Sequence, residues 1–218
     1  MIKTTLATAT MALALALTSC GGSSTQATQS SDAQAATISN DSTAIDTAAS
    51  TIQWKGTKPG GEHWGTVALQ SGQIYTNEAG ELVGGNFTID MASIVCADLD
   101  EASGKQALET HLKNEDFFNV AKYPTAKFEI TAVTPQATDS TTHLISGNLT
   151  LLDSTKNISF PATLTQANGV AEAKTVTFVI DRTQWGVTYS SKSIFAELKD
   201  KFINDNIELT ITAKTIAK

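Results

Sequence analysis

The chain has 218 residues, of which 41% are hydrophobic and 17% charged, and its formal net charge is −7 at pH 7. This length and composition predict one globular domain with a core of its own. The acidic balance and the lack of any long lysine or arginine run exclude the charge pattern of a nucleic-acid-binding protein. Charge alone would also not draw the chain to anionic lipid headgroups.

The first residues have the pattern of a secretory signal peptide. Lys3 is followed by an uncharged, apolar run over residues 6–17, which is too short to span a bilayer. The sequence LTSC at residues 17–20 resembles the bacterial lipobox, which implies removal of residues 1–19 and attachment of lipid to the Cys20 sulfur. The alternative is an ordinary signal peptide with a cysteine near the cleavage point. We expect a lipoprotein of the bacterial cell envelope, anchored to a membrane through Cys20 and facing the periplasm.

Residues 20–50 are rich in Ser, Thr, Ala, Gln and Asp and contain no aromatic residue. Such a segment cannot bury enough apolar surface to offset its chain entropy. We therefore expect a flexible tether between the lipid anchor and a domain that spans residues 51–218. Cys96 is the only cysteine of that domain, and we interpret it as a small core residue rather than a ligand.

From residue 51 onward, apolar and polar side chains alternate in short runs, as in strands with one apolar face. Turn sequences at residues 59–61, 77–80 and 168–169 separate the runs. About eight one-sided strands require antiparallel pairing and favour a closed all-β barrel, because closure leaves no exposed edge. A two-sheet sandwich would show the same alternation and stays open as an alternative.

One stretch interrupts the strand pattern. Leu108, Leu112 and Phe118 recur at helical spacing, Ser103 is a candidate N-cap, and Pro124 prevents continuation of a helix. These features predict one short helix near residues 104–118 that covers a mouth of the barrel.

The sequence HLKNEDFFNVAKYP at residues 111–124 resembles the signature of the YceI-like family. SGNLTL at 146–151 and IDRTQWG at 180–186 resemble further segments of that family in the expected order. The resemblance implies an extended, lipocalin-like barrel of eight strands that binds a polyisoprenoid or another long-chain amphiphile in its lumen. The chain departs from the family pattern at residues 152–154, where relatives often have a glycine, so we expect a different turn there.

An eight-stranded barrel is wide enough to hold one small ligand, and each buried CH₂ group of that ligand contributes about 0.8 kcal/mol. We expect a lumen left partly unfilled by small residues such as Gly65, Gly147 and Ala132, occupied by a polyisoprenoid, an isoprenoid quinone or a fatty amphiphile. Such a protein would serve as an envelope carrier, a lipid store or a stress-response factor. The predicted lining consists of Trp54, Val67, Phe87, Ile89, Phe128, Ile130, Leu149, Leu151, Phe160, Ala162, Phe178 and Ile180.

Two residues are candidates for contact with the polar head of the lipid. His111 could contact a head group or could anchor the helix–strand corner by pairing with Asp116. Arg182 could bind a phosphate, or could pair with Asp181 or Asp116 and stabilise the fold. For both residues we favour the structural interpretation, with the head-group contact as the alternative.

The sequence contains no motif of an enzyme. Its three histidines, His63, His111 and His143, show no metal-binding spacing, and no serine lies in a nucleophile elbow. We expect no catalytic residue, no metal and no cofactor other than a bound lipid. The alternatives are a surface interaction module without lipid and a metal-dependent enzyme whose site lies at the barrel rim, where His63 and His143 begin strands. Protein partners stay open, with a homodimer among the alternatives.

Overall fold

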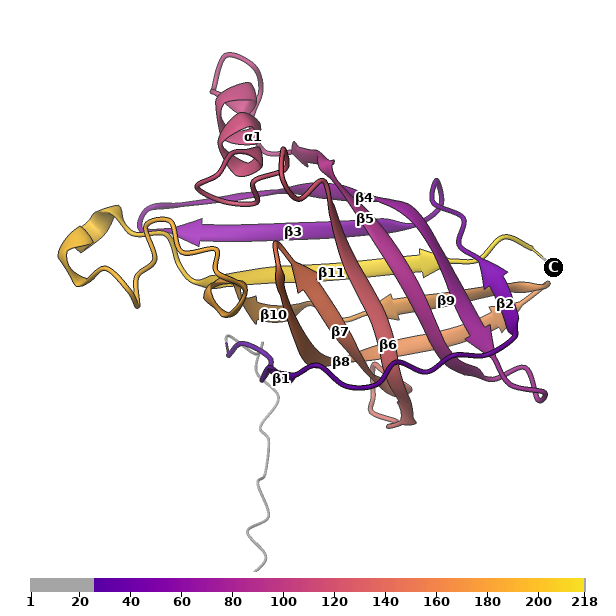
Figure 1. Ribbon diagram of the computed structural model, residues 1–218. Coiled ribbons are helices and arrows are strands. Elements are labelled where there is room, and N and C mark those ends of the chain that lie inside the picture. The colour runs from indigo at the N-terminus through magenta and orange to yellow at the C-terminus, as the bar shows by residue number, and fades with distance from the viewer. Residues whose placement is uncertain (1–25, 218) are drawn as a thin grey trace, which may run out of the picture.

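Successive antiparallel strands close into a barrel in the computed structural model, which describes residues 26–217 (Figure 1). The expected signal peptide and Cys20 lie outside these residues. The strands of the barrel are β3 (Thr51–Lys58), β4 (Gly61–Thr76), β5 (Leu82–Cys96), β6 (Thr125–Pro135), β7 (His143–Leu151), β8 (Ser154–Ala167), β9 (Val170–Thr175), β10 (Phe178–Asp181) and β11 (Asn206–Lys214).

Each strand from β3 to β8 pairs with the next, and β11 returns to pair with β3. The strand β9 closes the barrel because it pairs with both β8 and β11. The strand β10 pairs with a different part of β11, so β9 and β10 together occupy one position in the wall. The prediction of a closed, eight-stranded antiparallel barrel is confirmed, and the sandwich alternative is wrong.

The helix α1 (Lys105–Lys113) is shorter than the predicted 104–118. It begins after Gly104, which is the N-cap in place of Ser103 and has a φ of 96°, and it ends at Lys113 with Asn114 as the C-cap. Turns follow, in which Asn119 adopts a φ of 41°. The short helices η1 (Arg182–Trp185) and η2 (Ala196–Lys201) lie near the same end of the barrel as α1 (Figure 1). We call this end the α1 mouth and the opposite end the far mouth.

The structure differs from the expected flexible tether. Within residues 26–50, the strands β1 (Ser31–Asp32) and β2 (Asp41–Ala44) pair with β8 and β4, and the segment runs along the outside of the barrel between them (Figure 1). We call residues 28–45 the strap. Composition did not reveal the strap, because the strap is held by backbone hydrogen bonds to the barrel strands and needs no apolar core of its own.

Hydrogen bonds outside the strand pairings also hold the strap. Thr28 bridges β10 and β8, because its N–H donates to Val179 O (2.7 Å) and its hydroxyl to Ser159 O (2.8 Å). Asn148 binds the main chain of Gln34 twice: its Oδ1 accepts from Gln34 N (3.0 Å) and its Nδ2 donates to Gln34 O (2.7 Å). Further along, Thr37 N donates to Ile130 O (3.1 Å). Asn148 is only 5% exposed although it lies on the outward face of β7.

Replacement of Asn148 by Ala should loosen the strap. The variant loses both hydrogen bonds to Gln34, each of which contributes about 1 kcal/mol. We expect faster amide hydrogen exchange in residues 31–37, measured by mass spectrometry. Thr150→Val is the matched control, because Thr150 lies on the same face of β7 and bonds to Thr155 instead. Equal protection of residues 31–37 in the two variants would contradict the role given to Asn148.

The turn between β7 and β8 carries an unfavourable residue. Leu151 pairs with Ser154, which leaves a turn of two residues, and the first of them, Leu152, has a φ of 54°. Turns of this kind favour glycine at that position, because a left-handed backbone costs other L-residues roughly 1–2 kcal/mol.

Leu152→Gly should therefore be more stable than Leu152→Ala by about 1 kcal/mol, since both lack the leucine side chain and only glycine is free of the backbone strain. Urea denaturation of the two variants measures this difference in the free energy of unfolding. A Leu152→Ala variant as stable as Leu152→Gly would show that the turn has relaxed.

Candidate functional site

The barrel is hollow. A cavity of about 940 Å³ lies inside it, which is at the upper end of the range for ligand pockets. Its lining includes Leu112 at the α1 mouth and Gln166 at the far mouth, so the cavity extends along the whole barrel. Ile211 and other inward-facing apolar side chains are only partly buried, because they face this empty space.

The structure places every residue of the predicted lining except Ala162 on the wall of the cavity. Ala162 is fully buried among larger core side chains, and its short methyl group does not reach the lumen. The predicted lining also omitted residues whose alternation was visible in the sequence. They include Ile52, Leu69, Ile207, Leu209 and Ile211.

Two glycines expected to leave free space lie directly against neighbouring groups. A Cβ atom on Gly147 would collide with the Phe128 ring, and one on Gly65 would collide with the backbone oxygen of Val95 and lie 2.9 Å from Cζ2 of Trp54. Ala132 follows a bulge in β6 and does not line the cavity. The expectation that these small residues create the hollow is wrong; the barrel is hollow because the large inward side chains do not meet across it.

Aromatic rings form a row along one side of the lumen. The ring centroids of Phe87 and Phe128 are 6.3 Å apart, those of Phe128 and Phe160 5.5 Å, and those of Phe160 and Phe178 4.3 Å. The space above Gly147 lets the Phe128 ring reach across β7 toward Phe160. The result is a continuous apolar wall that offers no hydrogen bond to a ligand.

Arg182 holds the loop of the α1 mouth together. It is 2% exposed, and its guanidinium donates to the backbone oxygens of Val187 (2.8 Å), Tyr189 (2.9 Å), Ile203 (3.2 Å) and Asn204 (3.3 Å). Burial lowers its pKa from the ordinary value. These bonds engage the guanidinium in the loop itself, which favours the structural interpretation of Arg182 over the head-group interpretation. The expected pairing with Asp181 or Asp116 is wrong, since the carboxylate paired with Arg182 is that of Asp205, 3.7 Å away.

His111 lies at the same mouth and borders the cavity. Its Nε2 pairs with Asp116 Oδ2 at 3.0 Å, the partner named as the structural alternative. The ring also makes edge contacts with Phe117 (5.0 Å between centroids) and Tyr189 (4.8 Å). His111 thereby joins the segment after α1 to the mouth loop while one side of it faces the lumen.

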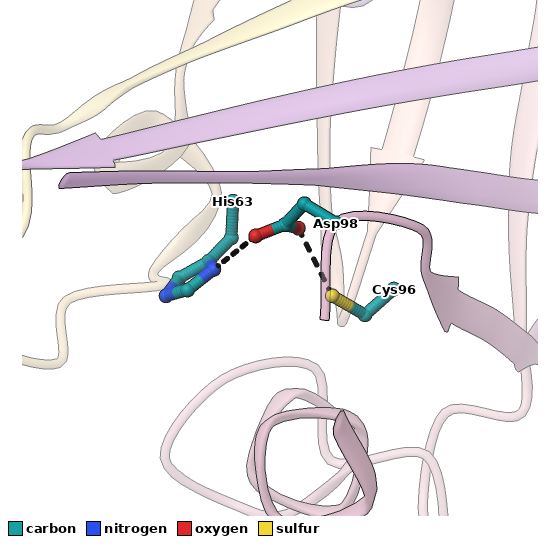
Figure 2. Close-up of side chains that lie close together, drawn as sticks. All are labelled: His63, Cys96 and Asp98. Carbon is teal, nitrogen blue, oxygen red and sulfur yellow. Dashed lines mark hydrogen bonds and ion pairs between the residues drawn. The ribbon is translucent and has the colours of Figure 1, made fainter. Parts of the chain in front are cut away.

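A second polar group at the α1 mouth was not predicted. His63 Nδ1 lies 2.8 Å from Asp98 Oδ2, and the Cys96 thiol donates to Asp98 Oδ1 at 3.1 Å (Figure 2). The pairing of β4 with β5 brings His63 near the other two residues. The sequence signal was the Cys-Ala-Asp spacing at the end of a strand, which is informative only once the partner strand is known.

The charges of this group are set by their surroundings. Burial alone would raise the pKa of Asp98, but hydrogen bonds from Cys96, from the Trp64 backbone N–H and from His63 outweigh it and lower the pKa to about 2. Burial, and then the bond to Asp98, raise the pKa of the Cys96 thiol. At neutral pH the group therefore holds one carboxylate and one protonated thiol.

The expectation that His63 and His143 share a rim is wrong. His63 lies at the α1 mouth beside the end of β5, whereas His143 begins β7 opposite Pro135, the last residue of β6. The antiparallel order of β4 to β7 places these positions at opposite ends of the barrel.

A closed antiparallel barrel around one long apolar cavity is the architecture of proteins that hold a small ligand in the lumen. The comparison with known proteins agrees: residues 44–215 match the YceI-like domain, and the chain belongs to the YceI-like family. No helix among residues 26–217 is long and apolar enough to cross a membrane.

Among relatives, a UPF0312 protein of Pseudomonas putida (strain W619) is 41% identical over 86 residues, and one of strain GB-1 is 40% identical. Each alignment covers 36% of this chain and 44% of the relative's length. Among solved structures, Burkholderia cenocepacia BcnA aligns with a TM-score of 0.60 at 20% identity, over 79% of this chain and 99% of BcnA. A polyisoprenoid-binding domain from Saccharophagus degradans aligns with a TM-score of 0.56 at 12% identity, over 80% and 98%. At sequence identities this low, the similarity to the two solved structures shows a shared fold and nothing further.

Asp205 should make the stability of the mouth loop depend on pH. Burial alone would raise its pKa, but contacts with Ser191 and Ser193 and the Arg182 guanidinium, 3.7 Å away, lower it below the ordinary 3.8. A carboxyl group whose pKa is lowered in the folded state stabilises the protein at pH values above the pKa that the group has in the unfolded chain. This contribution is lost as the pH falls through the pKa of the folded state.

We therefore expect Asp205→Asn to show a smaller loss of unfolding free energy than the wild type as the pH falls below about 4. Chemical denaturation at a series of pH values measures it. Asp139→Asn, in an exposed turn, is the control and should follow the wild type. Parallel curves for Asp205→Asn and the wild type would contradict the assignment.

Proposed function

We propose that this protein binds one long-chain lipid, such as a polyisoprenoid, an isoprenoid quinone or a fatty amphiphile, in the lumen of its barrel, and that it does so as a carrier or store and not as an enzyme. The observation that carries the proposal is the hollow apolar lumen of about 940 Å³. An alkyl or prenyl chain needs no hydrogen bonds, and each CH₂ group that leaves water contributes about 0.8 kcal/mol. The polyisoprenoid-binding domain of Saccharophagus degradans, which shares the fold, supports the same ligand class.

The two mouths differ in charge, which suggests how the ligand is oriented. The carboxylates of Asp41 and Glu81 border the cavity at the far mouth, whereas the Lys58 ammonium borders it at the α1 mouth. A phosphate or carboxylate head is repelled by the two carboxylates and attracted by the ammonium group. We therefore place the polar head at the α1 mouth and the chain end toward the far mouth, with His111 as the head-group contact.

The lipid anchor at Cys20 is part of the proposal. Because Thr28 is already bound to the barrel wall, only the seven residues 21–27 separate Cys20 from the folded domain. The fully extended span from Cys20 to Thr28 is about 28 Å. An acylated Cys20 would therefore hold the barrel close to the surface of an envelope membrane, where a lipid can enter without crossing much water.

A bulky residue in the lumen should block binding. Ile211 lines the cavity, whereas its neighbour Thr212 pairs with the exposed Thr51 and Lys174 and so lies on the outward face. We expect Ile211→Trp to weaken binding of a fluorescent long-chain alkyl probe by about tenfold or more, because the indole ring occupies the space of the chain. Thr212→Trp should bind as the wild type does.

The measurement is fluorescence titration of delipidated protein, with circular dichroism to confirm that both variants are folded. Native mass spectrometry of wild-type protein after mild purification should also show a bound lipid that Ile211→Trp lacks. Equal probe binding by folded Ile211→Trp and Thr212→Trp would refute binding in the lumen. A wild-type barrel that takes up no apolar ligand would favour the interaction-module alternative.

A further inference from the structure

The group formed by His63, Cys96 and Asp98 has the composition of a metal site. The imidazole nitrogen, the thiol sulfur and a carboxylate oxygen all lie within 4.8 Å of one another (Figure 2). Zinc is bound at about 2.0–2.3 Å by these ligand types, so donors around one tetrahedral ion lie roughly 3.5 Å apart. The contacts of 2.8 Å and 3.1 Å to Asp98 are slightly shorter than that, and small side-chain rotations would open the group around an ion.

The backbone holds these three residues in a fixed arrangement. Trp64 N donates to Asp98 Oδ1 (2.9 Å), and Ala97 N donates to Trp64 O (2.8 Å), which ties the segment after β5 to β4. Cys96 N donates to Glu109 Oε1 (2.8 Å), which ties it to α1. The ligand set is therefore largely preorganised, and binding of an ion needs little ordering of the chain.

The order of the three residues is unsuited to a thiol hydrolase. In that class the imidazole lies between the thiol and the carboxylate, so that it can take the thiol proton. Here the Asp98 carboxylate lies between the other two groups and contacts both. With the carboxylate between them, the imidazole cannot take the proton of the thiol directly. All three groups can, however, bind the same metal ion.

We propose that His63, Cys96 and Asp98 bind a divalent transition-metal ion of the zinc class at the α1 mouth. The sulfur and nitrogen ligands select such an ion over magnesium and calcium, which prefer oxygen ligands only. On binding, the Cys96 thiol releases its proton to solvent and its sulfur bonds to the metal, in place of the hydrogen bond to Asp98. One thiolate and one carboxylate then neutralise the two positive charges of the ion.

Three protein ligands leave one coordination position open, as in sites where zinc binds water or a substrate. His63 borders the cavity, so that position lies at the edge of the lumen. The metal site does not depend on lipid binding, and its failure would leave the proposed lipid function unaffected.

Cobalt(II) is the first probe, added to untagged protein that has been treated with a chelator. A thiolate bonded to cobalt gives a sulfur-to-metal charge-transfer absorption, which nitrogen and oxygen ligands alone do not give. We expect this band at one cobalt per chain, its loss in Cys96→Ala, and at least about tenfold weaker zinc binding by calorimetry in both Cys96→Ala and His63→Ala. His143→Ala, at the far mouth, is the matched control and should keep the wild-type affinity.

Zinc should also raise the melting temperature of the wild type but not that of Cys96→Ala, because an ion that binds only the folded state stabilises it. If Cys96→Ala does not fold, Asp98→Asn gives the same comparison. The proposal is overturned if folded wild-type protein shows no charge-transfer band with cobalt. It is also overturned if Cys96→Ala or its substitute binds zinc as tightly as the wild type, or if His143→Ala weakens binding to the same degree.

Discussion

Unequal strand length is the constraint that shapes this molecule. The strands β4 and β8 have 16 and 14 residues, whereas their partners β3 and β9 have 8 and 6. A closed sheet of such strands leaves backbone groups unpaired along the second half of β4 and the first half of β8, and unpaired edges beside an apolar lumen admit water. The strap covers both places, since β2 pairs with the end of β4 and β1 pairs with the start of β8.

The strap therefore belongs to the wall of the binding cavity. Thr43 and Ile45 border the lumen beside β4, and Thr28 connects β8 to β10 at the opposite gap. The family match begins at residue 44, so most of the strap precedes the family domain while completing its barrel. If Cys20 carries the proposed lipid anchor, the strap connects that anchor to the wall that encloses the lumen.

Alternation predicted the barrel and placed every named lining residue except Ala162 on its inward face, because period two depends only on which side of the sheet is apolar. It could not predict the strap, whose polar sequence is stabilised by Asn148 and by backbone groups distant in the chain. It also assigned Gly147 and Gly65 the wrong role, because the groups next to them, the Phe128 ring and the Val95 backbone, come from neighbouring strands. The group at His63 was missed for the same reason: its members meet only through the register of β4 and β5.

Buried and paired side chains hold the loop of the α1 mouth in place. Arg182 fixes the mouth loop from within, and His111 connects that loop to the segment after α1. The α1 mouth is thus held by a buried guanidinium, whereas the buried polar groups of the far mouth are uncharged hydroxyls such as those of Ser50 and Thr215. A ligand with a polar head and a long apolar tail has the same asymmetry, and a rigid, polar mouth can select the head because its groups do not need to be ordered on binding. Specificity for the head group should therefore reside at the α1 mouth, while the aromatic row and the rest of the apolar wall accept any chain of suitable length.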